Sequence, residues 1–426
     1  MHAACPRTSN TVNRKTDIRR VAVARFIGRL GAEAAFFVGI WGLAAYRFDA
    51  TASQLAALML VLGVSSMLGA AVGGVLIDRF GPTRVLVGAE ILYVPVALSL
   101  TLVDSLSALV ALVGFFGFIG APIMTATASF APYLAKERED LERANSLIEL
   151  AGSASFVLGP GLGALIVSVS TLDVVFYADA LLTIVAAIVV STVRTPPISS
   201  EERRHPLVEL ADGVRATYRL RSVRYYVLIG SVIWLGFGAF GALEPLFYRD
   251  AVGTGVETMG WMNSVFGVGL VCGALLLPRL PERVVSARGL ALGAAIVGLG
   301  AFAYVGSTRL VIIAIGSILW GTAIGAVEPL LRTLIHLDSP EEVMGRVMGT
   351  SQLCRSAGEL LPLAVAPWLA AQFGVQAVLI GSGLVLTALA LGSWWEAAAI
   401  DRAGPVRAAV RFEPFDPVDE PRSPNR

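Results

Sequence analysis

The sequence consists largely of apolar stretches of similar length that follow one another at a regular spacing. A helix needs about 20 apolar residues to cross the ~30 Å hydrocarbon core of a bilayer, and each stretch is close to that length. Hydrophobic residues make up 55% of the chain and charged residues only 15%, which excludes a soluble globular composition. The sequence therefore predicts an all-α polytopic membrane protein with twelve transmembrane helices. We place these spans at 21–46, 53–77, 84–103, 106–131, 144–169, 172–192, 224–248, 257–278, 288–306, 309–331, 346–371 and 375–399.

One long polar stretch divides the spans into two sets of six. The predicted units are an N-terminal tail (1–20), a six-helix half (21–193), a linker (194–223), a second six-helix half (224–400) and a disordered tail (401–426). In the run from Arg203 to Tyr226, apolar residues fall at helical spacing against several arginines. This pattern predicts an amphipathic helix on the inner membrane surface, and a solvated linker is the alternative.

The distribution of basic residues sets the orientation. The chain has 33 Lys and Arg, and nearly all fall in the two tails, the linker and every second loop. The opposite loops hold only Arg47, Arg249 and Arg309. The positive-inside rule therefore places both termini in the cytoplasm. Because charge is sorted by membrane side and the net charge is only +1, nothing in the sequence indicates nucleic-acid binding.

Several kinds of site are not indicated. Cys5, Cys272 and Cys354 are scattered without paired spacing, so neither a metal centre nor a disulfide framework is predicted. No HExxH, GxSxG or Walker sequence occurs, and GPGLGA lies within a span without a preceding strand. We therefore expect no enzyme activity, no cofactor and no drive by ATP.

Ionisable residues inside spans are the sharpest functional signals, because a charge at mid-bilayer costs ~3 kcal/mol on insertion scales. Glu33 lies near the midplane of the first span, and Arg29 is one helical turn before it, close enough to pair. Asp179, Glu244 and Glu328 lie in later spans. We predict that these five residues take part in proton coupling or substrate binding. Buried structural ion pairs, including Glu328 with Arg332 and Arg355 with Glu359, are the alternative.

The loop between the second and third spans carries a recognisable motif, GGVLIDRFGPTRVL. It resembles the signature loop of the major facilitator superfamily, G-x-L-x-D-R-x-G-R-R/K, at Gly74, Leu76, Asp78, Arg79 and Gly81. Pro82 and Thr83 replace the two basic residues, and Arg84 is the nearest remaining positive charge. The resemblance implies a gating role for Gly74, Asp78, Arg79, Gly81 and Arg84. It places Asp78 against the start of span 11, near Gly345 to Gly349, in the outward-facing state.

Two more stretches support this resemblance. GSASFVLGPGLGA in span 5 resembles the antiporter motif of the drug-exporting branches, so Gly159 and Pro160 are also expected to act in gating. GALEPLFYR, which ends at Arg249, recurs as GAVEPLLR, which ends at Arg332, with opposite polarity, as an inverted repeat predicts. Span 4 lacks the arginine that proton-antiporting branches usually carry. The pattern is most similar to the macrolide-efflux and enterobactin-exporter branch.

The family resemblance also suggests where a substrate would bind. In the superfamily, spans 1, 7 and 8 line a central cavity, and aromatic side chains are frequent in these spans here. They are expected to receive a flat, apolar and cationic molecule, with packing against lipid as the alternative. The aromatic residues concerned are Phe36, Phe37, Trp41, Trp234, Phe237, Phe240, Trp261 and Phe266.

These observations together predict a secondary active transporter that exports amphiphilic, drug-like small molecules by alternating access, with protons as the coupling ion. Two alternatives stay open. One is a facilitated-diffusion carrier or symporter for a metabolite or siderophore, and the other is a membrane receptor or scaffold that transports nothing. The expected partners are a small-molecule substrate, protons and lipids. The protein is expected to be a monomer in the cell inner (plasma) membrane.

Overall fold

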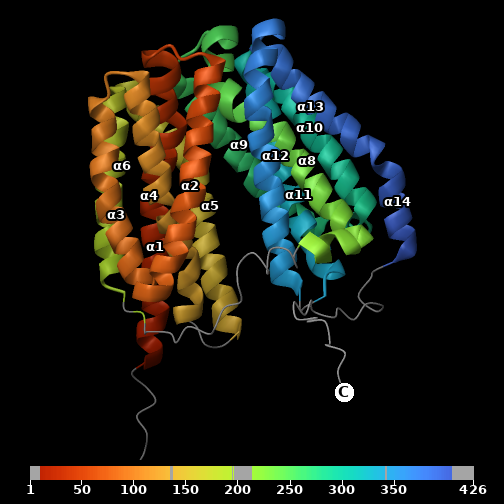
Figure 1. The fold of residues 1–426 in the computed structure, drawn as a ribbon, viewed down its shortest axis with the longest axis horizontal. Helices are drawn as coiled ribbons and strands as arrows, with labels where there is room; N and C mark the ends of the chain where they lie inside the picture. The colour runs from red at the N-terminus through yellow and green to blue at the C-terminus, as the bar shows by residue number, and fades with distance from the viewer. Residues whose placement is uncertain (1–9, 135–137, 194, 196–213, 341–342, 405–426) are drawn as a thin grey trace, which may run out of the picture.

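The computed structural model consists of helices packed side by side (Figure 1). The structure describes residues 10–134, 138–193, 195, 214–340 and 343–404, with the side chains of 10–14 and 138 excepted. In the N-terminal half the helices are α1 (Asn10–Ala34), α2 (Ala52–Phe80), α3 (Pro82–Ser99), α4 (Leu106–Leu134), α5 (Arg138–Val169) and α6 (Leu172–Ser191). In the C-terminal half they are α8 (Arg221–Leu246), α9 (Val256–Leu276), α10 (Ala287–Val305), α11 (Leu310–Asp338), α12 (Met344–Phe373), α13 (Val375–Gly392) and α14 (Trp394–Ala403).

Short helical segments extend or link these helices. Span 1 continues beyond α1 as two π-helical segments, and α8 ends in a third. The others are 3₁₀ turns after α3 and between α9 and α10. The segments are η1 (Ala35–Ile40), η2 (Gly42–Arg47), η3 (Leu100–Leu102), η4 (Phe247–Val252), η5 (Leu277–Arg279) and η6 (Glu282–Val284).

The helices agree with the predicted spans in number and order. Ten described helices are long and apolar enough to cross a membrane by length and composition. The other two spans are α1 and α12, which run through the bundle but carry more charge, including Arg25, Arg29, Arg355 and Glu359. These charged residues lower the mean hydropathy of the two helices, so hydropathy alone does not identify them as spans.

Several predicted boundaries change. Residues 10–20 were expected to be a tail but continue α1, where Arg20 pairs with Asp17 at 3.3 Å. The last span breaks at Ser393, and α14 extends to Ala403, into the predicted tail. Asp401 there accepts hydrogen bonds from the first backbone amides of α10, which fixes α14 to the C-terminal half.

The linker prediction is only partly covered by the structure. Residues 214–219 are helical, with Val214 and Tyr218 exposed, as an amphipathic helix requires. The rest of the predicted amphipathic helix, the start of the N-terminal tail and residues 405–426 lie outside the described residues.

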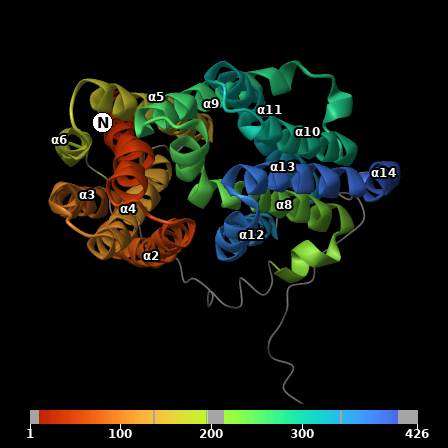
Figure 2. The ribbon, with the colours of Figure 1, turned by 90° about the horizontal axis from the view of Figure 1, so that it is seen from above.

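The two halves lie side by side (Figure 2), and they diverge toward the end where α1 begins and α14 ends (Figure 1). Contacts between the halves run along α5 with α9, and along α2 with α8 and α12. We call the side on which α1 begins and α14 ends the inner side.

Small residues let α5 fit closely between α1 and α9. A Cβ atom added at Gly163 would lie 2.9 Å from the Val38 Cβ of the first span. On the other face of α5, a Cβ at Gly260 of α9 would lie 2.8 Å from the Pro160 carbonyl oxygen. The glycines of the span 5 motif thus form a contact between span 1 and the opposite half.

One arginine links the halves on the outer side. Arg249, in η4, pairs with Asp49 at 2.7 Å and donates a hydrogen bond to the Ala45 carbonyl at 2.7 Å, both in the N-terminal half. Asp49 has a left-handed backbone (φ 48°), which is uncommon outside glycine. The molecule is therefore closed on its outer side.

Candidate functional site

A cavity of about 700 Å³ lies in the inner part of the bundle. Its wall comes from α1, α2, α3, α4 and α6 of the N-terminal half and from α12 of the C-terminal half. On span 1 the lining runs from Ala24 of α1 to Phe36 of η1, and on α12 it includes Gln352 and Ser356. Four acidic or basic side chains line the cavity, among a mainly apolar wall: Arg25, Arg29, Glu33 and Glu90.

A second cavity of about 290 Å³ adjoins the first, between the halves. The two share Phe36, Ser66 and Ser356 among their lining residues. The smaller cavity adds Gly238 of α8 and Glu359 of α12. Together they form a hollow that both halves enclose, which we call the central cavity.

Glu33 and Arg29 form an ion pair in the wall of the central cavity. The Arg29 Nε lies 2.7 Å from the Glu33 Oε1, with side chains 25% and 13% exposed. One turn toward the inner side, Arg25 lies 3.9 Å from Glu149 of α5. Residues spaced by four share one helix face, so α1 presents a row of charge to the cavity. The contact between Arg29 and Glu33 that the sequence predicted is thus confirmed.

Glu90 of α3 also lies in this cavity, buried and with one carboxylate oxygen that makes no hydrogen bond to any described residue. A Cβ at Gly28 of α1 would lie 3.8 Å from its other oxygen. The sequence marks Glu90 as an acid within an apolar span. Helix periodicity alone, however, does not place a residue of span 3 beside span 1.

Asp179 of α6 is fully buried behind the wall of the central cavity. It accepts a hydrogen bond of 3.0 Å from the hydroxyl of Tyr93, which itself lines the cavity. Its second oxygen is packed against Gly31 of α1 and has no hydrogen-bond partner among described residues. Asp179 therefore does not line the cavity itself and is linked to it through Tyr93.

Glu328 of α11 has other partners than the sequence indicated. The predicted pairing with Arg332 is wrong, because Arg332 is exposed and Glu328 lies 2.8 Å from Arg355 of α12. The Trp234 indole donates a second hydrogen bond of 2.9 Å to Glu328, and the Arg355 guanidinium lies 4.5 Å from the centre of a Trp234 ring. These contacts join α8, α11 and α12, and the described residues show no ion pair between Arg355 and Glu359.

Glu244 lies near the outer end of α8 in a buried polar network. The hydroxyl of Tyr304 donates to it, and the amide of Asn263 donates at 3.2 Å. The Tyr304 hydroxyl also contacts the hydroxyl of Tyr248 at 2.8 Å. Glu244 and Glu328 each lie in the C-terminal part of their helix, and α8 and α11 end on opposite sides of the membrane, as the repeat predicts. Neither residue lines the central cavity.

Of the eight aromatic residues predicted to line the cavity, Phe36 lies in its wall. Trp41, Phe240 and Phe266 are buried elsewhere, and the other four also lie outside the lining of the central cavity: Phe37, Trp234, Phe237 and Trp261. Phe237 stacks on Trp320 at 4.6 Å within the core of the C-terminal half, where Phe240 and Phe266 also pack. In this conformation the C-terminal cluster is therefore core packing.

The predicted gating residues of the signature loop lie at the inner end of α2 and the start of α3, whereas Gly159 and Pro160 lie within α5, nearer its outer end. Gly81, with φ 81°, ends α2 and begins the turn into α3, which requires a residue without a Cβ. Asp78, Arg79 and Arg84 are exposed, and Arg79 lies 5.3 Å from the ring centre of Phe80. Gly159 and Pro160 lie in the α5 contact with α1 and α9.

Comparison with known proteins agrees with this architecture. The family profile of the Major Facilitator Superfamily matches residues 21–362, so the chain belongs to this superfamily. It is a secondary transporter and not an enzyme. The protein is similar in fold to the nucleoside transporter NupG (TM-score 0.69, 13% identity, 89% of this chain and 98% of that one). It is also similar to a bacterial homologue of the iron transporter ferroportin in an inward-facing state (TM-score 0.68, 16% identity, 90% and 99%).

Relatives in sequence are distant. An uncharacterized MFS-type transporter of Bacillus subtilis, YfiS, is 22% identical over 82% of this chain and 86% of its own length. Macrolide efflux protein A of Streptococcus pyogenes is 25% identical over 51% and 57%. The enterobactin exporter EntS of Escherichia coli is 24% identical over 76% and 78%.

Proposed function

We propose that this transporter exports amphiphilic small molecules from the cytoplasm by alternating access, with protons driving the exchange. The observation that carries the proposal is the Arg29–Glu33 pair in the wall of a hollow that both halves enclose. The apolar wall suits an amphiphile, and the charged row of α1 gives a binding end. Relatives named as macrolide and enterobactin exporters favour export over uptake. We propose that the protein acts as a monomer in the plasma membrane.

In this proposal, coupling arises because a proton and a cationic substrate compete for Glu33. The carboxylate is stable in a mostly buried place because Arg29 compensates its charge. A cationic substrate, or a proton, that neutralises Glu33 would release Arg29 and change the balance of charge in the cavity. One charge moving through 100 mV releases ~2.3 kcal/mol, enough to sustain a gradient of more than tenfold.

The inner gate of this cycle is proposed to close where α2 meets α12. The two helices already touch at mid-membrane, where a Cβ at Gly63 would lie 3.2 Å from Leu360. Gly74 on α2 and Gly349 on α12 each lie about 16 Å further toward the inner side, at 1.5 Å per residue. A Cβ on either would meet nothing within 4 Å. Closure of these two open glycine faces would bring Asp78 to the N-terminus of α12, where a carboxylate is favoured.

Everted vesicles test the proposal with dyes, lipophilic cations, macrolides and siderophores as substrates. We expect accumulation that an uncoupler abolishes, and we expect Glu33→Gln to abolish it while the protein still inserts. The matched control is Glu139→Gln, which removes the carboxylate of another Arg–Glu pair with the same spacing but on the exposed surface of α5.

Other outcomes separate the alternatives. Flux that persists with the uncoupler, and in Glu33→Gln, would contradict proton coupling and indicate facilitated diffusion. Absence of flux for every compound on the panel would contradict transport of amphiphiles and indicate a receptor or scaffold.

A further inference from the structure

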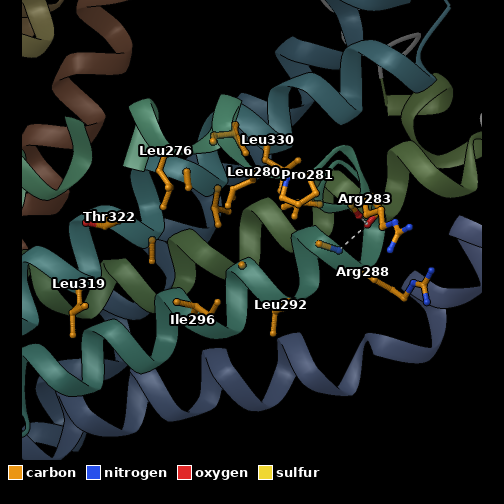
Figure 3. Close-up of a pocket in the computed structure, with 18 of the residues that line it drawn as sticks. Leu276, Leu280, Pro281, Arg283, Arg288, Leu292, Ile296, Leu319, Thr322 and Leu330 are labelled. Atoms are coloured by element: carbon orange, nitrogen blue, oxygen red, sulfur yellow. Dashed lines mark hydrogen bonds between the residues drawn. The ribbon is translucent and has the colours of Figure 1, made fainter. Parts of the chain in front are cut away.

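A second large hollow, separate from the central cavity, lies on the C-terminal half near the inner side. Its volume is about 730 Å³, and its walls are α9, α10, α11 and the turn between α9 and α10 (Figure 3). It shares no lining residue with the central cavity, so it lies outside the proposed transport route. We call it the α9–α11 groove.

The floor of the α9–α11 groove is apolar and open to the membrane. Leu292 and Ile296 of α10 and Leu319 of α11 line it, and each side chain is about half exposed. These residues belong to spans, so their exposed surface faces hydrocarbon rather than water. A molecule that enters the groove would therefore come from the bilayer.

The length of the groove matches one leaflet. Its lining extends from Arg288 to Ile296 on α10 and from Leu330 to Leu319 on α11. At 1.5 Å per residue these distances are about 12 and 16 Å. Half of a ~30 Å hydrocarbon core is about 15 Å, so the groove reaches from the inner surface to the bilayer midplane.

Positive charge gathers at the inner end of the groove, away from Leu319 (Figure 3). Arg283 is exposed there and makes no ion pair with any described residue. The Nε of Arg288 beside it donates a hydrogen bond of 2.8 Å to Asp401, and its terminal nitrogens make no hydrogen bond to any described residue. Trp394 completes this end, and indole rings favour the headgroup level of a bilayer.

We propose that the α9–α11 groove binds an anionic phospholipid of the inner leaflet. One acyl chain lies along Leu292, Ile296 and Leu319, and the phosphate lies between Arg283 and Arg288. Asp401 compensates only one of the two arginines, so the site keeps a net positive charge that selects an anionic headgroup over a zwitterionic one. A basic side chain near an anionic lipid surface gives about a fivefold preference.

Photo-crosslinking in reconstituted vesicles tests the site. The probes are phosphatidylglycerol and phosphatidylcholine, each with a diazirine in the middle of one acyl chain, added in trace to phosphatidylcholine vesicles. Digestion and mass spectrometry then locate the adducts. We expect phosphatidylglycerol to label 288–296 and 319–330 at least about fivefold more than phosphatidylcholine does.

Two variants test the contribution of the positive charge and that of the apolar groove separately. Arg283→Gln, which breaks no ion pair within the described residues, is expected to lower phosphatidylglycerol labelling about fivefold, whereas Arg279→Gln on the neighbouring turn, outside the lining, leaves it unchanged. Leu292→Trp fills the groove with both arginines in place and is expected to remove the adducts. Equal labelling by the two lipids, full labelling in Arg283→Gln, or adducts that persist in Leu292→Trp would each overturn the proposal.

Discussion

At the scale of single residues, charge inside the bilayer is held by specific partners, and the C-terminal half gives a direct test. Arg355 and Glu328 are 16% and 18% exposed, so removing one partner leaves a mostly buried charge without compensation. We expect Arg355→Gln to destabilise the protein by ~3 kcal/mol or more, and Arg355→Gln with Glu328→Gln by less. Thermal unfolding in detergent measures both. Arg332→Gln is the control, and a loss of stability there equal to that of Arg355→Gln would contradict the observed pairing.

At the scale of helices, the proposed inner gate depends on the glycine face of α12. Gly349→Leu meets open space in the present conformation, so folding should be kept, and leucine is the better helix former by ~1 kcal/mol. If α2 must approach this face, the leucine blocks closure and transport falls at least tenfold while the unfolding temperature does not. Gly381→Leu on α13 also meets open space and serves as the control. Normal transport by Gly349→Leu would exclude this route of closure.

At the scale of the whole molecule, Arg249 holds the outer side closed through Asp49 and the Ala45 carbonyl. Hydrogen bonds to charged groups contribute ~1.5–3 kcal/mol, so Arg249→Ala should raise the outward-open population roughly tenfold. Spin labels at positions 139 and 279, on the inner side of the two halves, should then report shorter distances. Arg309→Ala, at the other outer arginine of the C-terminal half, should leave the distances unchanged. Unaltered distances in Arg249→Ala would show that this contact does not set the conformation.

The sequence by itself determined the spans, their order and their orientation, because bilayer thickness and the sorting of charge act on each segment separately. It also determined the Arg29–Glu33 contact, since a one-turn spacing needs no knowledge of other helices. The motif likewise predicted the turn at Gly81 between the second and third spans.

Only the tertiary structure decided which distant helices share a partner. Arg355 of α12, and not Arg332, lies beside Glu328, and Glu90 of α3 lies beside Gly28 of α1. The aromatic residues of α8 and α9 pack with Tyr304 and Trp320, which no local pattern linked to them. Such contacts depend on how each helix is rotated in the bundle. Within the membrane, close packing of small residues and the pairing of polar groups set that rotation, and both depend on side chains far apart in the sequence.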